Sequence, residues 1–143
     1  MKSKLISDEP KTWALIFETG DEFPALLTQF AQSAGLKASR FTAIGAFERA
    51  TFGYFDWEKK DYIPIPVDEQ VEVLALTGDI AIYDGKPQVH AHAVVGLRDG
   101  STRGGHVLQA FVRPTLEVIV DEARRELHKR YDPDIGIALI DVG

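Results

Sequence analysis

Cysteine is absent from this chain of 143 residues. Its absence excludes disulfide bonds and thiolate metal sites, and it leaves the redox state of the protein's compartment undetermined. It also excludes a cysteine nucleophile. Because no serine stands in a GxSxG motif, the sequence gives little support to nucleophilic catalysis of either kind.

An excess of basic charge is missing too. The chain has 16 Lys and Arg against 22 Asp and Glu, which gives a formal net charge of -6 at pH 7. Even its densest cationic stretch, residues 121–134, contains more acidic than basic side chains. Because nucleic-acid-binding proteins usually attract phosphate through a basic face, this balance argues against strong non-specific binding of DNA or RNA.

Long apolar runs and phosphate-binding glycine motifs are also missing. The longest apolar runs, such as 13-WALIF-17, fall far short of the ~20 residues of a membrane span. The N-terminal stretch MKSKLISDEPK lacks the apolar core of a signal peptide. Neither a GxxxxGKS or GxxxxGKT loop nor a GxGxxG entering a helix occurs. We therefore expect a cytoplasmic protein that does not contact a membrane.

The composition of the chain indicates a globular protein. With 45% hydrophobic and 27% charged residues, the composition is that of a folded chain, and the length suits one domain. We expect a single domain over residues 1–143, with its core between about 11 and 142.

One helix and many short strands are predicted. Apolar residues recur at helical spacing over about 22–35, with Asp21 as the N-cap and Gly35 as the stop. The remaining β-like runs are closely spaced and leave little room for crossover helices, so the expected fold is α+β with a largely antiparallel mixed sheet. The expected strands are 13–17, 40–47, 49–57, 60–65, 70–83, 88–97, 103–112, 115–122 and 135–142.

Three of the four histidines fall in one stretch, 90-HAHAVVGLRDGSTRGGH-106. If residues 88–97 and 103–112 are the arms of a hairpin, the connection Arg98-Asp99-Gly100 is a three-residue loop with glycine at the position that needs positive φ. In that register His92 lies opposite His106, and His90 lies on the same face two residues away. All three imidazoles then converge.

The register decides whether the site exists. A two-residue Asp99-Gly100 turn would move His106 to the opposite face of the hairpin. A bulge at Gly104-Gly105 could restore the convergence. These two glycines also permit close approach of the backbone to a ligand or to another chain, and their plain interpretation is that they form a bulge.

Three neutral imidazoles and a water molecule form a known zinc arrangement with an open position. We predict a metal site at His90, His92 and His106, with zinc as the first candidate, although imidazole also suits other late first-row metals. A metal-free polar pocket and three unrelated surface positions are the alternatives. Glu117, in 115-TLEVIV-120, would be a metal ligand, a neighbour of the ligands or a general base, unless it is a solvent-facing strand residue.

The same stretch, through its HxH and GGH elements, resembles the signature of the plant and prokaryote conserved (PPC) domain. In plants this domain follows AT-hook motifs in nuclear proteins, and in prokaryotes it stands alone. Supporting segments extend the resemblance to nearly the whole chain: 15–23, 44–56, 72–81, 115–120 and 129–140.

The resemblance implies an antiparallel sheet with one main helix, a homotrimer, and metal binding through His90, His92 and His106. It also implies contacts of the domain with itself and with other proteins, and prokaryotic members are often called DNA-binding by similarity. An AT-hook needs an Arg-Gly-Arg-Pro core, whereas the only Arg-Gly of this chain, Arg103-Gly104, continues into Gly105.

Three functions follow from these observations. The favoured one is a metal-binding homotrimeric module that interacts with proteins or a small ligand. The second is a metal-dependent enzyme of unknown substrate, with Glu117 as its base; this interpretation is the less favoured one. The third is a DNA-binding regulator, which the resemblance suggests and the net charge does not support.

Overall fold

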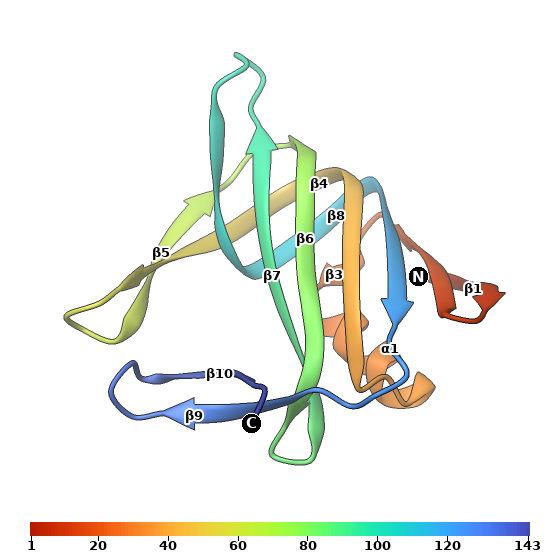
Figure 1. The fold of residues 1–143 in the computed structure, drawn as a ribbon. Coiled ribbons are helices and arrows are strands. Elements are labelled where there is room, and N and C mark those ends of the chain that lie inside the picture. Colours follow the sequence, from red (N-terminus) through yellow and green to blue (C-terminus); the bar gives the residue numbers. More distant parts are fainter.

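The computed structural model describes all residues, 1–143, as ten strands and one short helix (Figure 1). The expected class, a largely antiparallel mixed sheet with one helix, is confirmed. The elements are β1 (Lys2–Asp8), β2 (Lys11–Glu18), β3 (Glu22–Phe23), α1 (Ala25–Ala34), β4 (Ala38–Asp56), β5 (Asp61–Val67), β6 (Val71–Tyr83), β7 (Lys86–Gly96), β8 (Thr102–Glu122), β9 (His128–Asp132) and β10 (Ile137–Asp141).

The sheet closes on itself around four strands. β8 pairs with β4, β4 with β6, β6 with β7, and β7 returns to pair with the beginning of β8, all antiparallel. The other end of β8 pairs with β2, which carries β1 at the edge. Because closure removes free edges, the histidine-bearing hairpin β7–β8 is held on both sides by hydrogen-bonded neighbours.

Two strands are longer than the sequence suggests. The runs 40–47 and 49–57 form the single strand β4, and the runs 103–112 and 115–122 form the single strand β8. The interruptions are bulges rather than turns, since the pairing of β4 with β8 shifts between Gly45 and Arg49. Bulges bend and twist a strand without ending it, and this curvature allows the sheet to close. β1, β3 and β9 were not among the expected strands.

The helix is shorter than predicted, and its expected N-cap is wrong. α1 starts after Pro24, and no side chain caps it. The carboxylate of Asp21 instead accepts a hydrogen bond from the backbone N–H of Glu18 and pairs with the amino terminus of Met1. The residues before Pro24 are extended because Glu22 and Phe23 pair with β8 as β3. The predicted stop is confirmed, since Gly35 has a φ of 67°.

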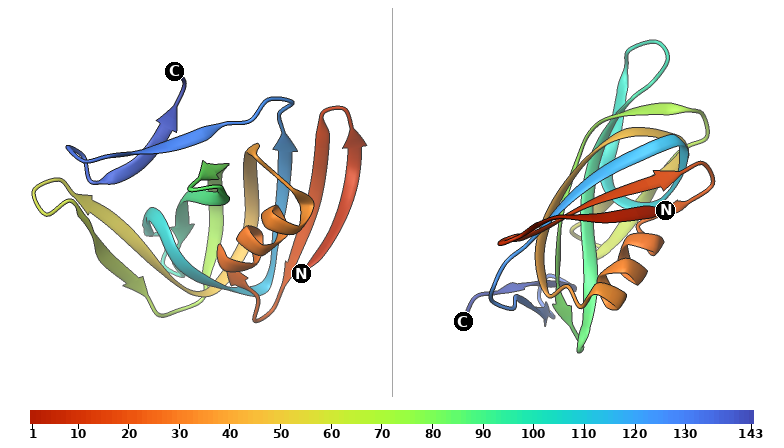
Figure 2. Two further views of the ribbon diagram at one scale, coloured as in Figure 1. Left: turned by 90° about the horizontal axis from the view of Figure 1, so that it is seen from below. Right: turned by 90° about the vertical axis from the view of Figure 1, so that its right-hand side faces the viewer.

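The hydrophobic core lies between α1 and the sheet (Figure 2). Leu27 and Ala31 of the helix are buried, and five buried phenylalanines from three strands belong to the same core cluster: Phe17, Phe23, Phe41, Phe47 and Phe52. α1 is too short and too polar to span a membrane. Its role in this fold is to cover one face of the sheet.

The C-terminal hairpin β9–β10 lies beside the main sheet (Figure 1). It joins the sheet at one point, where His128 pairs in parallel with Ile82 of β6. Its turn contacts the turn between β4 and β5, because the Lys60 ammonium donates a hydrogen bond to the carbonyl oxygen of Pro133 at 3.2 Å. The hairpin is therefore fixed at its base and at its tip.

Candidate metal centre

The β7–β8 hairpin has the predicted register. His92 pairs with His106 and Gly96 with Thr102 across the two strands. The loop Arg98-Asp99-Gly100 connects them, with Gly100 at a φ of 82°. The Asp99 carboxylate accepts hydrogen bonds from the Ser101 backbone N–H at 2.9 Å and from its hydroxyl group. The loop thus fixes which residues face each other.

The double glycine allows the strand backbones to approach closely. A Cβ atom on Gly104 would stand 2.3 Å from the carbonyl oxygen of Ala93, and one on Gly105 would stand 2.7 Å from that of Gly53. Both distances are shorter than any real contact of a Cβ atom, so only glycine fits without a backbone shift. The glycines bring β8 against β7 on one side and β4 on the other, with His106 next in the chain.

The three histidines converge as expected from the register. The ring centroids of His90 and His92 are 5.0 Å apart, and His106 lies 5.1 Å from the first and 5.6 Å from the second. One ring nitrogen from each residue lies within 4.8 Å of the others. The three side chains are partly exposed, so a small solute can reach them from solvent.

The donor set fits a late first-row metal ion. The Nε2 atoms of His90 and His92 lie 3.2 Å apart. Two nitrogens of a tetrahedral zinc site, each ~2.0–2.1 Å from the ion, are about 3.3 Å apart. The Nδ1 atom of His106 is buried without a hydrogen-bond partner. A bound ion would take one ring nitrogen from each histidine, and three histidines leave one coordination position open.

Burial and neighbouring positive charges favour the neutral imidazole at His92 and His106. Burial is the largest cause that lowers the pKa of His106 to about 4, and the charges of His90, His92 and Lys129 lower it further. Burial and the charge of His90 also lower the pKa of His92. A metal ion binds the neutral form of imidazole, so at these two histidines little proton release opposes its binding at neutral pH.

Asp79, Lys129 and Tyr62 also lie beside the histidines, and none of the three was predicted from the sequence. The Asp79 carboxylate lies 3.3 Å from His90 Nδ1 and 2.9 Å from the Lys129 ammonium. The Tyr62 ring stacks on His106 with centroids 4.4 Å apart. The β6–β7 turn Asp84-Gly85 would have placed Asp79 opposite His90 by register. Lys129 and Tyr62 reach the site through long-range packing, for which the sequence contains no local signal.

Glu117 is not part of this cluster. Its side chain is exposed on β8, between Ile16 of β2 and Ile44 of β4. It is not among the groups whose ligand atoms gather around a common point. Of the alternatives that the sequence allows for Glu117, the structure shows the solvent-facing strand position.

A family model matches most of the chain. The model of the Plants and Prokaryotes Conserved (PCC) domain covers residues 7–124, which include β2 through β8 and all three histidines. No curated protein matches the sequence.

Solved structures share the fold over nearly their full length. A protein from Ralstonia eutropha JMP134, named as a candidate DNA-binding protein, is 30% identical with a TM-score of 0.85, over 92% of this chain and 91% of its own. A plant- and prokaryote-conserved (PPC) protein from Pyrococcus horikoshii is 26% identical with a TM-score of 0.85, over 98% and 94%. A metal-containing protein from Archaeoglobus fulgidus is 29% identical with a TM-score of 0.84, over 97% and 96%.

Proposed function

Because this chain belongs to the Plants and Prokaryotes Conserved domain family, we propose that it is a metal-binding module of that family, with His90, His92 and His106 as the ligands. The observation that carries the proposal is the convergence of one ring nitrogen from each of the three histidines within 4.8 Å. The relative from Archaeoglobus fulgidus, which is named as metal-containing, supports it.

Zinc is the first candidate for the ion. Three neutral imidazoles in a tetrahedral arrangement are a zinc donor set, and no carboxylate stands among the ligands to favour a harder ion such as magnesium. The open fourth position would take water or one donor atom of a small ligand. In this proposal the ion anchors an interaction with a ligand or a protein partner.

Metal analysis of the purified protein tests the proposal. We expect about one zinc ion per chain, removable with a chelator and restored by adding zinc. His92→Ala should lower the bound metal to a small fraction of this value. His128→Ala is the matched control, because His128 is the one histidine outside the cluster and pairs with Glu126 on the surface. Glu126 keeps its contact with Lys37 in this variant, so the base of the C-terminal hairpin stays anchored. Equal metal contents in these two variants would contradict the proposed ligand set.

We further propose that the module is a homotrimer. The outer face of the sheet supports self-association, since Ile16, Ile44 and Ile119 of three adjacent strands expose 36%, 61% and 41% of their surface. Apolar side chains gathered on one face commonly mark a contact with another protein surface. Light scattering on the purified protein would give the number of chains directly.

DNA binding is the second candidate function. It is favoured by the name of the relative from Ralstonia eutropha JMP134, a candidate DNA-binding protein. The net charge of -6 weighs against it. If DNA is bound, the affinity for duplex should fall steeply between about 50 and 200 mM salt. An unshifted duplex at low salt, with micromolar protein, would exclude this function.

A further inference from the structure

A buried lysine stands beside the three histidines. The side chain of Lys129 is only 3% exposed, although lysine is rarely buried unless it is paired with an opposite charge. Its ammonium lies 2.9 Å from Oδ1 of Asp79. Lys129 belongs to β9, beyond the residues 7–124 that the family model covers. A segment outside the matched region therefore supplies a charge to the site.

The second oxygen of Asp79 is directed at the cluster. Oδ2 lies 3.3 Å from Nδ1 of His90, and the two residues are cross-strand partners on β6 and β7. Each carboxylate oxygen thus has one partner, the ammonium on one side and the imidazole on the other. Burial alone would raise the pKa of Asp79, but hydrogen bonds from His90 and Lys129 outweigh this effect and lower it.

The arrangement selects one tautomer of His90. An ionised carboxylate can only accept hydrogen bonds, so the 3.3 Å contact of its Oδ2 with Nδ1 of His90 favours the imidazole that carries its proton on Nδ1. In the neutral imidazole the lone pair then lies on Nε2, which can accept a hydrogen bond from His92 in the metal-free protein or bind a metal ion. Nε2 is also the atom that lies 3.2 Å from Nε2 of His92, on the side where a metal ion would sit.

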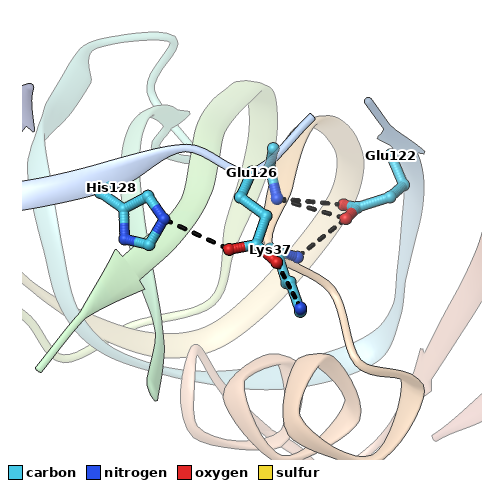
Figure 3. Close-up of polar contacts among 5 residues, drawn as sticks. Lys37, Glu122, Glu126 and His128 are labelled. Atoms are coloured by element: carbon cyan, nitrogen blue, oxygen red, sulfur yellow. Dashed lines mark hydrogen bonds and ion pairs between the residues drawn. The ribbon is translucent and has the colours of Figure 1, made fainter. Parts of the chain in front are cut away.

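The base of the C-terminal hairpin is anchored just before Lys129. Glu126 accepts from the ammonium of Lys37 and pairs with His128 at 3.3 Å, while Glu122 accepts from the backbone N–H of Lys37 (Figure 3). Backbone hydrogen bonds join Leu127 to Lys37 and to Ile82. These contacts hold the chain against β4 and β6, and the residue that follows them is directed at Asp79.

We propose that Lys129 and Asp79 form a positioning pair, through which the C-terminal hairpin fixes the tautomer and direction of His90 for metal binding. The expected effect on metal affinity rests on the proposed metal site, but the tautomer of His90 is a property of the metal-free protein. Neither residue is a ligand in this proposal. Carboxylates that hold a ligating histidine in this way typically contribute 10–100-fold to metal affinity.

A positioning role of Lys129 can be distinguished from a purely electrostatic effect of its charge on the bound ion. A lysine ammonium beside the site repels a divalent ion, so its removal would strengthen metal binding if charge alone mattered. A positioning role predicts the opposite result, because Asp79 would no longer be held against His90. Lys129→Met keeps the length of the side chain and removes the charge, so the sign of the change in affinity distinguishes the two roles.

NMR of the metal-free wild-type protein is the first test. Nitrogen-15 shifts and couplings of the imidazole ring at neutral pH should show His90 protonated at Nδ1 and unprotonated at Nε2. The opposite tautomer would overturn the inference. This measurement needs no variant, so it decides the question even if substitutions at Asp79 or Lys129 prevent folding.

Zinc titration of the variants is the second test. We expect the dissociation constant to rise roughly 10–100-fold in Asp79→Ala and roughly 10-fold in Lys129→Met. Arg130→Met is the matched control, because Arg130 is the next residue of β9, is exposed, and pairs with Asp141 away from the site. It should bind zinc as the wild type does.

The outcomes separate the two proposals. Unchanged or tighter zinc binding in Lys129→Met would overturn the positioning pair while leaving the three-histidine site intact. A wild-type protein that binds no metal would overturn the proposed function, and the tautomer of His90 would then still show whether Asp79 and Lys129 orient the ring.

Discussion

His106 couples the protonation state of the site to the stability of the fold. Burial, followed by the neighbouring charges, lowers its pKa to about 4 from the ordinary value of 6.5. Between these two pH values the unfolded chain binds the proton and the folded chain does not. The contribution of His106 to stability is therefore fully present above pH 6.5 and is lost as the pH falls towards 4.

We expect the free energy of unfolding of the metal-free protein to decrease between pH 7 and 5, and to decrease less in His106→Gln. Urea titrations in the presence of a chelator at several pH values measure both slopes. Part of the slope should remain in the variant, because the pKa of His92 is lowered for similar reasons. Equal slopes in the two proteins would show that His106 titrates as it does in the unfolded chain.

Gly104 is a second single residue on which the stability of the fold depends, and its effect is steric. A Cβ atom there would collide with the carbonyl oxygen of Ala93, which belongs to the backbone and cannot move alone. We expect Gly104→Ala to lower the free energy of unfolding by about 1–3 kcal/mol, the range typical of overpacking. Gly96→Ala is the control in the same hairpin, since its new methyl group would meet only the flexible side chain of Leu74 at 3.3 Å. A chemical denaturation curve for each variant tests the difference.

At the scale of elements, the β7–β8 hairpin is the part of the site that can be predicted from the sequence. The loop Arg98-Asp99-Gly100 is local, so its length sets the pairing of His92 with His106 without any knowledge of the rest of the fold. The helix stop at Gly35 was predictable for the same reason. Local turn chemistry acts over a few residues and is visible in one sequence.

What could not be predicted depends on distant parts of the chain. The expected N-cap Asp21 fails because Glu22 and Phe23 are recruited as β3 by β8, almost ninety residues later. The sequence pattern predicted two shorter strands in place of each long strand, β4 and β8, because the residues that form a bulge also form turns. Lys129 meets Asp79 only because the chain after β8 crosses to β6.

The register of the hairpin can be tested by engineered cysteines. The chain has no native cysteine, so a pair introduced at Gly96 and Thr102, which are directly opposite, should form a disulfide on mild oxidation. Cysteines at Gly96 and Arg103 should cross-link poorly, because these residues point to opposite faces of the hairpin. Mass spectrometry of the oxidised proteins distinguishes them. Preferential cross-linking of the second pair would indicate a register shifted by one residue, in which His106 does not face His92.

At the scale of the whole molecule, the face of the sheet opposite α1 exposes apolar side chains. α1 protects one face, whereas the outer face of β2, β8 and β4 exposes Ile16, Ile44 and Ile119 around the carboxylate of Glu117. The metal site and this face lie on the same strand, β8, at its two ends. Assembly through the outer face would therefore leave the histidines accessible within each subunit.

Substitution of one exposed isoleucine tests whether this face is the contact of the proposed trimer. We expect light scattering to give three chains for the wild type and a smaller assembly for Ile44→Asp, because a buried unpaired carboxylate in an apolar contact costs several kcal/mol. Leu139→Asp is the control, since Leu139 is also exposed, at 40%, but lies on the C-terminal hairpin. Metal content should stay the same in all three proteins, because neither residue contacts the histidines. A wild-type monomer, or a trimer that persists in Ile44→Asp, would exclude this face as the subunit interface.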